Sequence, residues 1–200
     1  METPPLRLTV ATRGSPLALA QTRMVIRQAQ ALLPGLGVEV KIIRTTGDKL
    51  QTAAMAQTPA VPKGLFTKEL ETALLDGEAD FAVHSLKDLP TDLPTGLVLG
   101  AVLPRADARD VLIHKAASGS PLEDPLACLP QGGVVASTST RRREQLLAAR
   151  PDLKVVDIRG NVGTRLLKLA ERSEWCATLL AAAGLARLGF RIEPDGRIVH

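Results

Sequence analysis

The sequence predicts an α/β fold in which strands and helices alternate within two lobes. Apolar runs of strand length recur along the 200 residues, and segments with apolar residues at helical spacing stand between most of them. A polar stretch at 104–110 interrupts the alternation and reads as a crossover. We therefore expect a first lobe over 1–103, a second lobe over 111–192 and the start of a further segment over 193–200. Alternation of this kind places helices on both faces of a sheet.

The first lobe begins with a strand and a capped helix. Residues 6–10 alternate apolar and polar side chains, as a half-buried strand does. Ser15 suits the cap of a helix and Pro16 its first turn, while Pro34-Gly35 ends that helix. The remaining elements expected in this lobe are a strand over 38–43, a loop over 47–62, a helix that opens at Lys63, a strand that starts at Phe81, and a strand over 96–102.

The second lobe shows the same alternation. The expected strands cover 111–113, 134–136, 154–158 and 176–181, and the expected helices cover 139–149, 161–171 and 182–188. No closing element is expected after the last helix, and the chain reads as cut short.

Composition narrows the classes of function. The net charge of +4 and the pI near 9.4 fit nucleic acid, a membrane surface or an acidic small molecule about equally. An aromatic content of only 2% argues against a protein that stacks bases. No apolar run approaches the length that spans a bilayer, and the N-terminus lacks a basic-then-apolar signal segment, so we expect a cytoplasmic protein. The three histidines have no ligand spacing, which gives no support for a metal site.

One acidic elbow carries the most chemical information. The apolar run that begins at Phe81 leads directly into His84-Ser-Leu-Lys87-Asp88-Leu-Pro90. Open α/β sheets bind ligands at the carboxyl ends of their strands. One interpretation is that Asp88 holds N–H groups of a ligand and stabilises a developing cation. The alternative is a surface ion pair between Lys87 and Asp88, which contributes little energy.

Three other elbows carry arginine and offer sites for anions. Arg13-Gly14-Ser15 precedes a helix, where free N–H groups favour an anion, although Ser15 is also explained as a simple helix cap. Ser137–Arg143 repeats this arrangement with Thr138, Ser139 and three arginines. Successive helical positions differ by about 100°, so we expect Arg141 and Arg142 to face the ligand and Arg143 to face solvent, unless the whole run is a solvated face. The third elbow is Arg159–Arg165, which has no P-loop signature.

Four motifs, in order along the chain, resemble those of the hydroxymethylbilane synthase family, also called porphobilinogen deaminase. They are Ala11-Thr-Arg-Gly-Ser-Pro-Leu-Ala-Leu-Ala-Gln21, Lys63-Gly-Leu-Phe-Thr-Lys-Glu-Leu-Glu71, His84-Ser-Leu-Lys-Asp-Leu-Pro90 and Arg159-Gly-Asn-Val-Gly-Thr-Arg-Leu166. The resemblance covers residues 6–190. It implies an α/β fold with two periplasmic-binding-protein-like lobes, mixed sheets flanked by helices, and a cleft between the lobes.

The resemblance also implies a function. The family is a transferase of tetrapyrrole and haem biosynthesis that joins four porphobilinogen units into linear hydroxymethylbilane and releases ammonia each time. Asp88 would be the catalytic carboxylate. The groups implied to bind carboxylates of substrate and cofactor are Arg13, Ser15, Lys63, Ser85, Lys87, Thr138, Ser139, Arg141, Arg142, Arg159 and Arg165. Porphobilinogen and oligopyrrole intermediates would be the partners, without nucleic acid or membrane, and a complete chain would be a monomer.

The chain departs from the family in three respects. The family tethers its dipyrromethane cofactor to a cysteine in a third domain, and the chain ends before such a domain. Neither Cys128 nor Cys176 lies in a matching motif, so neither is assigned as the attachment point. The first sheet is expected to lack a later strand, and residues 51–62 lack the usual glycine pair. A non-catalytic bilobed anion-binding protein, an inactive fragment of the family and a nucleic-acid-binding protein therefore stay open as alternatives.

Overall fold

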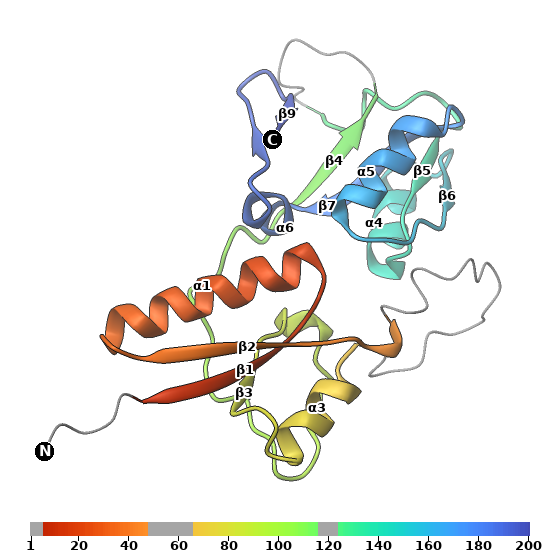
Figure 1. The fold of residues 1–200 in the computed structure, drawn as a ribbon. Coiled ribbons are helices and arrows are strands. Elements are labelled where there is room, and N and C mark those ends of the chain that lie inside the picture. The colour runs from red at the N-terminus through yellow and green to blue at the C-terminus, as the bar shows by residue number, and fades with distance from the viewer. Residues whose placement is uncertain (1–5, 48–65, 116–123) are drawn as a thin grey trace, which may run out of the picture. The chain divides into compact units, whose positions relative to one another are not determined.

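The chain forms two compact units, each built around its own sheet. The computed structural model describes residues 6–47, 66–115 and 124–200. Unit 1 is Met1–Pro104 and unit 2 is Arg105–His200 (Figure 1). Within the described ranges, no helix is long and apolar enough to cross a membrane.

Unit 1 contains a three-stranded parallel sheet in the order β2-β1-β3. The central strand β1, Arg7–Arg13, pairs with β2, Gly37–Ile43, along all seven residues. On its other side β1 pairs with the short strand β3, Phe81–Ala82, opposite Val10 and Ala11. Because the strands are parallel, the chain leaves β1 and β3 at the same edge of the sheet.

Two helices cover opposite faces of this sheet. Ala11 of β1 is fully buried against Leu70 of α3, Lys68–Leu75. The next residue, Thr12, accepts a buried hydrogen bond of 2.7 Å from the hydroxyl of Thr22 in α1, Pro16–Leu32. Successive strand residues point to opposite faces, so α1 and α3 lie on either side of the sheet, as Figure 1 shows.

Unit 2 contains a mixed sheet in the order β4-β7-β5-β6. The strands β5, β6 and β7 are parallel to one another, and β4 is antiparallel to β7. Their bounds are β4 Asp110–His114, β5 Val134–Ala136, β6 Lys154–Val156 and β7 Trp175–Ala181.

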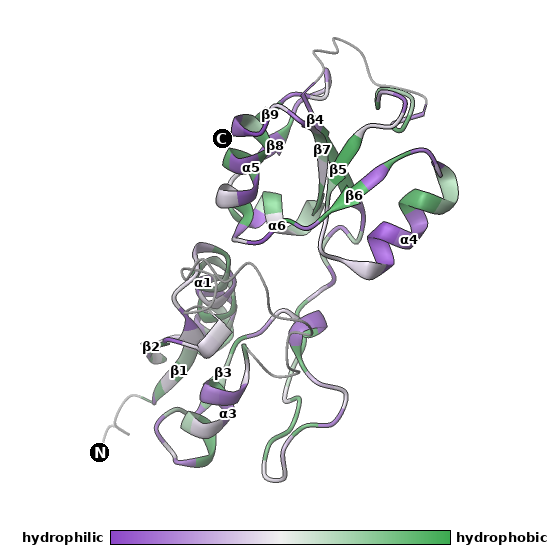
Figure 2. Ribbon diagram, turned by 90° about the vertical axis from the view of Figure 1, so that its right-hand side faces the viewer, coloured by the Kyte–Doolittle hydropathy of each residue, from purple (hydrophilic) through white to green (hydrophobic). Residues whose placement is uncertain are grey.

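The helices of unit 2 also cover both faces. Val135 packs in one core cluster with Leu146 of α4, Thr140–Ala149, whereas Ala136 packs in another with Leu169 of α5, Val162–Glu171. A third helix, α6, Ala182–Arg187, follows β7 directly. Figure 2 shows β5 as hydrophobic and much of α4 as hydrophilic, in keeping with a buried strand and an exposed helix face.

The α/β class predicted from the sequence is confirmed, and most predicted elements are present within a few residues. The predicted strand over 96–102 is wrong. That segment has no regular structure, and Val98 and Val102 are 84% and 67% exposed. An apolar run forms a strand only beside a backbone partner, and the described residues provide none for it. The predicted loop over 47–62 and Lys63 lie outside the described residues, except for Gly47.

The chain also ends in a small hairpin that was not predicted. The strands β8, Arg191–Ile192, and β9, Ile198–Val199, pair antiparallel. Gly196 adopts a φ of +84° in the connecting turn, a conformation that favours glycine. Pro194 and Asp195, which precede this glycine, are also residue types that favour turns.

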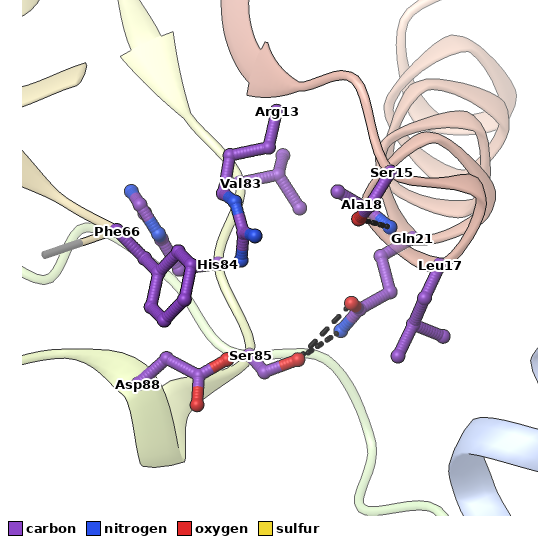
Figure 3. Close-up of a pocket in the computed structure, with 10 residues that line it drawn as sticks. All are labelled: Arg13, Ser15, Leu17, Ala18, Gln21, Phe66, Val83, His84, Ser85 and Asp88. Carbon is purple, nitrogen blue, oxygen red and sulfur yellow. Dashed lines mark hydrogen bonds between the residues drawn. The ribbon is translucent and has the colours of Figure 1, made fainter. Parts of the chain in front are cut away.

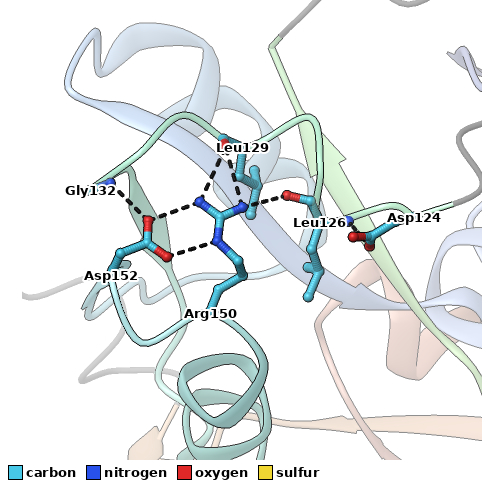
Figure 4. Close-up of polar contacts among 6 residues, drawn as sticks. All are labelled: Asp124, Leu126, Leu129, Gly132, Arg150 and Asp152. Carbon is cyan, nitrogen blue, oxygen red and sulfur yellow. Dashed lines mark hydrogen bonds and ion pairs between the residues drawn. The ribbon is translucent and has the colours of Figure 1, made fainter.

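An ion pair in unit 2 ties three segments together (Figure 4). Arg150 donates to both carboxylate oxygens of Asp152, at 2.7 and 2.8 Å, and to the Leu126 carbonyl at 2.8 Å. The N–H of Gly132 donates to the same carboxylate at 2.9 Å. The Arg150 side chain holds the pKa of Asp152 well below its usual range, with the Gly132 N–H adding to the effect. The pair therefore anchors the loop before β5 to the end of α4.

We expect Arg150→Met to lower the free energy of unfolding of unit 2, because it leaves a poorly exposed carboxylate without its cation. The two side chains are only 22% and 20% exposed. Urea unfolding followed by the fluorescence of Trp175, the one tryptophan, measures this change.

Arg109→Met is the matched control, since Arg109 and Asp107 are also two residues apart but are 85% and 39% exposed. It should lower the free energy of unfolding much less than Arg150→Met does, because an exposed ion pair contributes little. Equal losses in the two variants would contradict a special role for the Arg150 pair.

Candidate active site

A pocket in unit 1 lies where the chain leaves β1 and β3 (Figure 3). It has a volume of about 380 Å³, part of which is open solvent. The residues that line it are Arg13, Ser15, Leu17, Ala18, Gln21, Phe66, Val83, His84, Ser85 and Asp88. The pocket thus combines a carboxylate, a guanidinium, hydroxyls and an aromatic ring at the carboxyl edge of a parallel sheet, where α/β proteins bind ligands.

The first wall of the pocket comes from the turn between β1 and α1. Arg13 is the last residue of β1, and its guanidinium lies 4.1 Å from the ring centroid of Phe66. Ser15 caps α1, and its Oγ accepts the N–H of Ala18 at 3.3 Å. The N-terminus of a 17-residue helix therefore opens beside the pocket, where its free N–H groups favour an anion.

The second wall comes from the elbow after β3. A single 3-10 turn, η1, Leu86–Asp88, is closed by a 2.8 Å hydrogen bond from the Asp88 N–H to the Ser85 carbonyl. The Ser85 hydroxyl is hydrogen bonded to the Gln21 amide, with Oγ 2.9 Å from Nε2 and 3.0 Å from Oε1. This contact fastens the elbow to α1, and Figure 3 shows the side chains of Arg13, Phe66 and Asp88 converging in the pocket.

The Asp88 carboxylate is not part of a surface ion pair with its neighbour. Within the described ranges, no salt bridge joins Asp88 to Lys87. Both residues are exposed, but only Asp88 lines the pocket. The structure therefore leaves the Asp88 oxygens available to a ligand.

In unit 2, the residues after β5 form an elbow of small polar side chains. The Ser139 N–H donates to Ser137 Oγ at 3.3 Å, and Thr138 Oγ1 donates to the Ile158 carbonyl at 3.1 Å. Ser139 is the N-cap residue of α4, but its side chain makes no capping hydrogen bond. The Ser139 hydroxyl is thus not used by the helix that follows it.

The arginines on α4 differ in their surroundings. Arg141 and Arg143 are both exposed. Arg142 forms a bidentate pair with Asp110 of β4, at 2.8 and 2.5 Å, and also donates to the Leu179 carbonyl at 3.2 Å. Arg142 is therefore held against the sheet, and the expected solvation of Arg143 agrees with the structure.

The elbow between β6 and α5 holds a second, half-buried arginine. Gly160 has a φ of +119°, and a Cβ there would meet Thr164 at 2.7 Å. Asn161 caps α5 by accepting the Thr164 N–H at 2.9 Å. Arg165 donates to the Gly160 carbonyl at 2.8 Å, and no carboxylate pairs with it in the part of the chain that the structure describes. Burial, and to a lesser degree Arg142, lowers the pKa of Arg165.

Comparison with known proteins gives this geometry its context. Residues 8–198 match a family model described as "Porphobilinogen deaminase, dipyromethane cofactor binding domain". The chain belongs to the porphobilinogen deaminase family.

Relatives in the family are similar along nearly the whole chain. A porphobilinogen deaminase of Syntrophomonas wolfei is 51% identical over 91% of the chain, and one of a Nitratiruptor species is 51% identical over 98%. The matched parts are 56% and 59% of those two proteins, so the chain spans little more than half the length of its relatives. Among solved structures, the VFT2 domain of Bordetella pertussis BvgS matches 90% of the chain and 67% of its own, at 18% identity and a TM-score of 0.46.

The structure brings together some of the residues predicted to act in such a site. Arg13, Ser15, Ser85 and Asp88 line one pocket, whereas Lys87 lies beside it on η1. Lys63 lies outside the described residues. In unit 2, Arg142 and Arg165 are close enough for charge interaction, and the remaining predicted residues follow the ends of β5 and β6: Thr138, Ser139, Arg141 and Arg159.

Sequence reasoning missed six of the residues that line the pocket, and three of the six, Gln21, Phe66 and His84, carry polar or aromatic side chains. All three lie within the family-like motifs, so their position in those motifs was the available signal. Asp110, the partner of Arg142, was placed in a polar crossover, and nothing in that stretch indicates a pairing 32 residues away.

The half-buried His84 predicts a pH dependence of stability. Burial lowers the pKa of His84 below its ordinary 6.5, Asp88 and Glu71 oppose this, and Arg13 reinforces it. Below pH 6.5 the unfolded chain therefore binds a proton that the folded chain resists, and stability falls as the pH drops from 6.5 toward the lowered pKa. His84→Gln should weaken this pH dependence in urea unfolding.

His200→Gln serves as the control, because His200 is exposed and lies far along the chain from the pocket residues. It should leave the pH dependence unchanged. If His84→Gln behaves like His200→Gln, a different group accounts for any loss of stability in acid.

Proposed function

We propose that the chain carries the catalytic carboxylate and the carboxylate-binding residues of a hydroxymethylbilane synthase, which condenses porphobilinogen units with loss of ammonia. The observation that carries the proposal is Asp88, whose carboxylate lines a pocket beside Arg13 and Ser15 at the carboxyl ends of two parallel strands. Membership of the family supports the reaction class.

The proposed role of Asp88 follows from charge and hydrogen bonding. A carboxylate accepts hydrogen bonds from pyrrole N–H groups and so orients a substrate ring. When the carbon–nitrogen bond of the protonated aminomethyl group breaks, its electron pair leaves with ammonia and the positive charge spreads over the pyrrole ring. Asp88 stabilises that charge through its own negative charge. The next pyrrole then forms a carbon–carbon bond to the methylene and loses its ring proton.

The arginines are proposed to hold the carboxylates that every porphobilinogen unit carries. Arg13 faces the pocket in unit 1, and Arg165 is half-buried without a carboxylate partner among the described residues of unit 2. Guanidinium groups bind carboxylates through two parallel hydrogen bonds, and removal from water strengthens the attraction.

A dipyrromethane cofactor fits the same donors, because it too is a polycarboxylate. Two observations favour such a group in unit 2: the half-buried Arg165 has no carboxylate partner among the described residues, and the Ser139 side chain makes no capping hydrogen bond. When bound, dipyrromethane supplies the pyrrole on which the first unit is built. Burial raises the pKa of both Cys128 and Cys176, which does not favour a thiolate at either position.

A non-catalytic anion-binding protein is the competing function, since the same cationic elbows would hold a polyanion without reaction. It gives no reason for a carboxylate beside the Arg13 guanidinium in the pocket. Porphobilinogen and its oligomers as ligands, a monomeric state and a cytoplasmic location stay predictions.

The catalytic role of Asp88 is tested by incubating the purified chain with porphobilinogen. Intact mass and the absorbance of oxidised porphyrin are recorded together. We expect the unaltered chain to bind porphobilinogen, and mass increments of pyrrole units together with porphyrin would show that it also turns the substrate over. In Asp88→Asn, turnover should fall by about 10²–10³-fold while porphobilinogen still binds, because charge stabilisation is lost but size is kept.

Asp92→Asn is the control, since Asp92 is an exposed carboxylate four residues later that does not line the pocket. It should retain full turnover. Binding without increments or product from the unaltered chain, and identical behaviour of Asp88→Asn, would favour the anion-binding alternative.

The role of Arg165 is tested by binding. Arg165→Met should weaken the affinity for porphobilinogen by about tenfold to a hundredfold, the range expected for a lost charge-assisted hydrogen bond. Arg143→Met, at an exposed arginine, should leave the affinity within about twofold. Isothermal titration calorimetry with porphobilinogen measures the affinity of both variants. An unchanged affinity in Arg165→Met would remove Arg165 from the proposed site.

A further inference from the structure

Gly47 lies directly against the ring of Phe66. A Cβ added at Gly47 would stand 2.1 Å from Cε1, 2.3 Å from Cδ1 and 2.8 Å from Cζ of that ring. No real Cβ approaches another heavy atom so closely, so any larger residue at this position requires the ring to move. Gly47 itself is buried, whereas Phe66 is half-buried.

The backbone does not explain why this residue is glycine. Seven of the described glycines have a positive φ, and Gly47 is not among them. Its helical conformation is one that alanine adopts more readily than glycine. Alanine is therefore disfavoured at this position because the Phe66 ring occupies the space that its Cβ would need.

The position of Gly47 relative to α3 is held by its neighbour. Thr46 donates its N–H and its hydroxyl to the same oxygen of Glu69, at 2.7 and 2.6 Å. Phe66 stands just before α3, so the turn with Gly47 and the segment with Phe66 are fixed to each other. A Cβ at Gly47 is thus accommodated by movement of the ring and not of the turn.

The Phe66 ring also contacts Arg13, so the position of the ring affects the pocket. The Arg13 guanidinium lies over the ring at 4.1 Å from its centroid, and both residues line the pocket with Asp88. A cation over an aromatic face is held by the ring's quadrupole, so a displaced ring no longer holds the guanidinium in the same place.

We infer that Gly47 is a positioning residue, which sets the place of the Phe66 ring and, through it, the place of the Arg13 guanidinium in the pocket. The pocket then offers a flat aromatic face next to a cation and a carboxylate, which suits a heteroaromatic ring bearing carboxylates. This choice of ligand rests on the proposed function, whereas the coupling of Gly47 to Arg13 does not.

The coupling is tested by the NMR ring-current shift of the Arg13 side-chain protons, which needs no ligand. The unaltered chain should show these protons shifted upfield by the Phe66 ring. The shift should be lost in Phe66→Leu and strongly reduced in Gly47→Ala. Gly100→Ala is the matched control, because Gly100 has no positive φ and a Cβ there meets nothing within 4 Å; it should leave the shift intact. An intact shift in folded Gly47→Ala overturns the inference.

Titration with porphobilinogen tests the consequence for the ligand. Gly47→Ala should weaken binding by about threefold to tenfold, as expected for loss of a partly desolvated cation–π contact and its alignment. In the Phe66→Leu background, where the ring is absent, Gly47→Ala should have no further effect. An equal effect in both backgrounds also overturns the inference.

The two proposals fail in different ways. Absence of porphobilinogen binding by the unaltered chain would count against the proposed function, while the ring-current measurement would still decide the role of Gly47. If Gly47→Ala does not fold, the Phe66→Leu/Gly47→Ala double variant separates the causes, because a clash with the ring predicts that folding is restored. Continued failure to fold in the double variant contradicts the inference.

Discussion

Parallel pairing of β1 with both of its neighbours is the constraint on which unit 1 depends. Pairing with β3 brings the ends of two strands to one edge, although the residues that follow them, Gly14 and Val83, are almost seventy positions apart in the chain. The buried hydrogen bond between Thr12 and Thr22 then holds α1 to the same strand. A slip of one residue in β1 would turn Thr12 toward α3 and Ala11 toward α1, which would bury a hydroxyl without a partner. The register and the pocket are therefore specified by the same residues.

In unit 2, the ends of parallel strands also meet at one edge of the sheet, but the balance of charge there is different. The elbows after β5 and β6 also follow parallel strands, so Ser139 and Arg165 come from the same edge of a sheet. Here the cationic groups outnumber the acids, and one arginine is already paired with Asp110. Unit 1 instead presents Asp88 and Arg13 in one pocket. Under the proposed function, the reaction would take place at Asp88 in unit 1, and the arginines of unit 2 would retain anions.

The sequence predicted the parts of the fold that depend on local patterns. Ser15 before Pro16 indicated the start of α1, and Asp88 after an apolar run indicated the acidic elbow, because caps and strand ends are read from neighbouring residues. The strand expected over 96–102 failed because its apolar residues indicate burial, whereas a strand also needs a backbone partner that pattern alone does not reveal. Gln21 and Phe66 were missed as pocket residues for a related reason. Each acts through a residue distant in sequence, Ser85 and Arg13 respectively.

The pair between Arg142 and Asp110 has a consequence for the thermodynamics of ligand capture. A long arginine side chain loses about 2 kcal/mol of rotamer entropy when it is held in one geometry. In this protein Asp110 and the Leu179 carbonyl hold Arg142 in one geometry. The rotamer entropy is therefore lost when the chain folds, before any ligand binds. An anion that reaches this guanidinium meets an ordered donor but must share it with Asp110. In the proposed site, Arg142 would therefore contribute more to discrimination by shape than to the strength of binding.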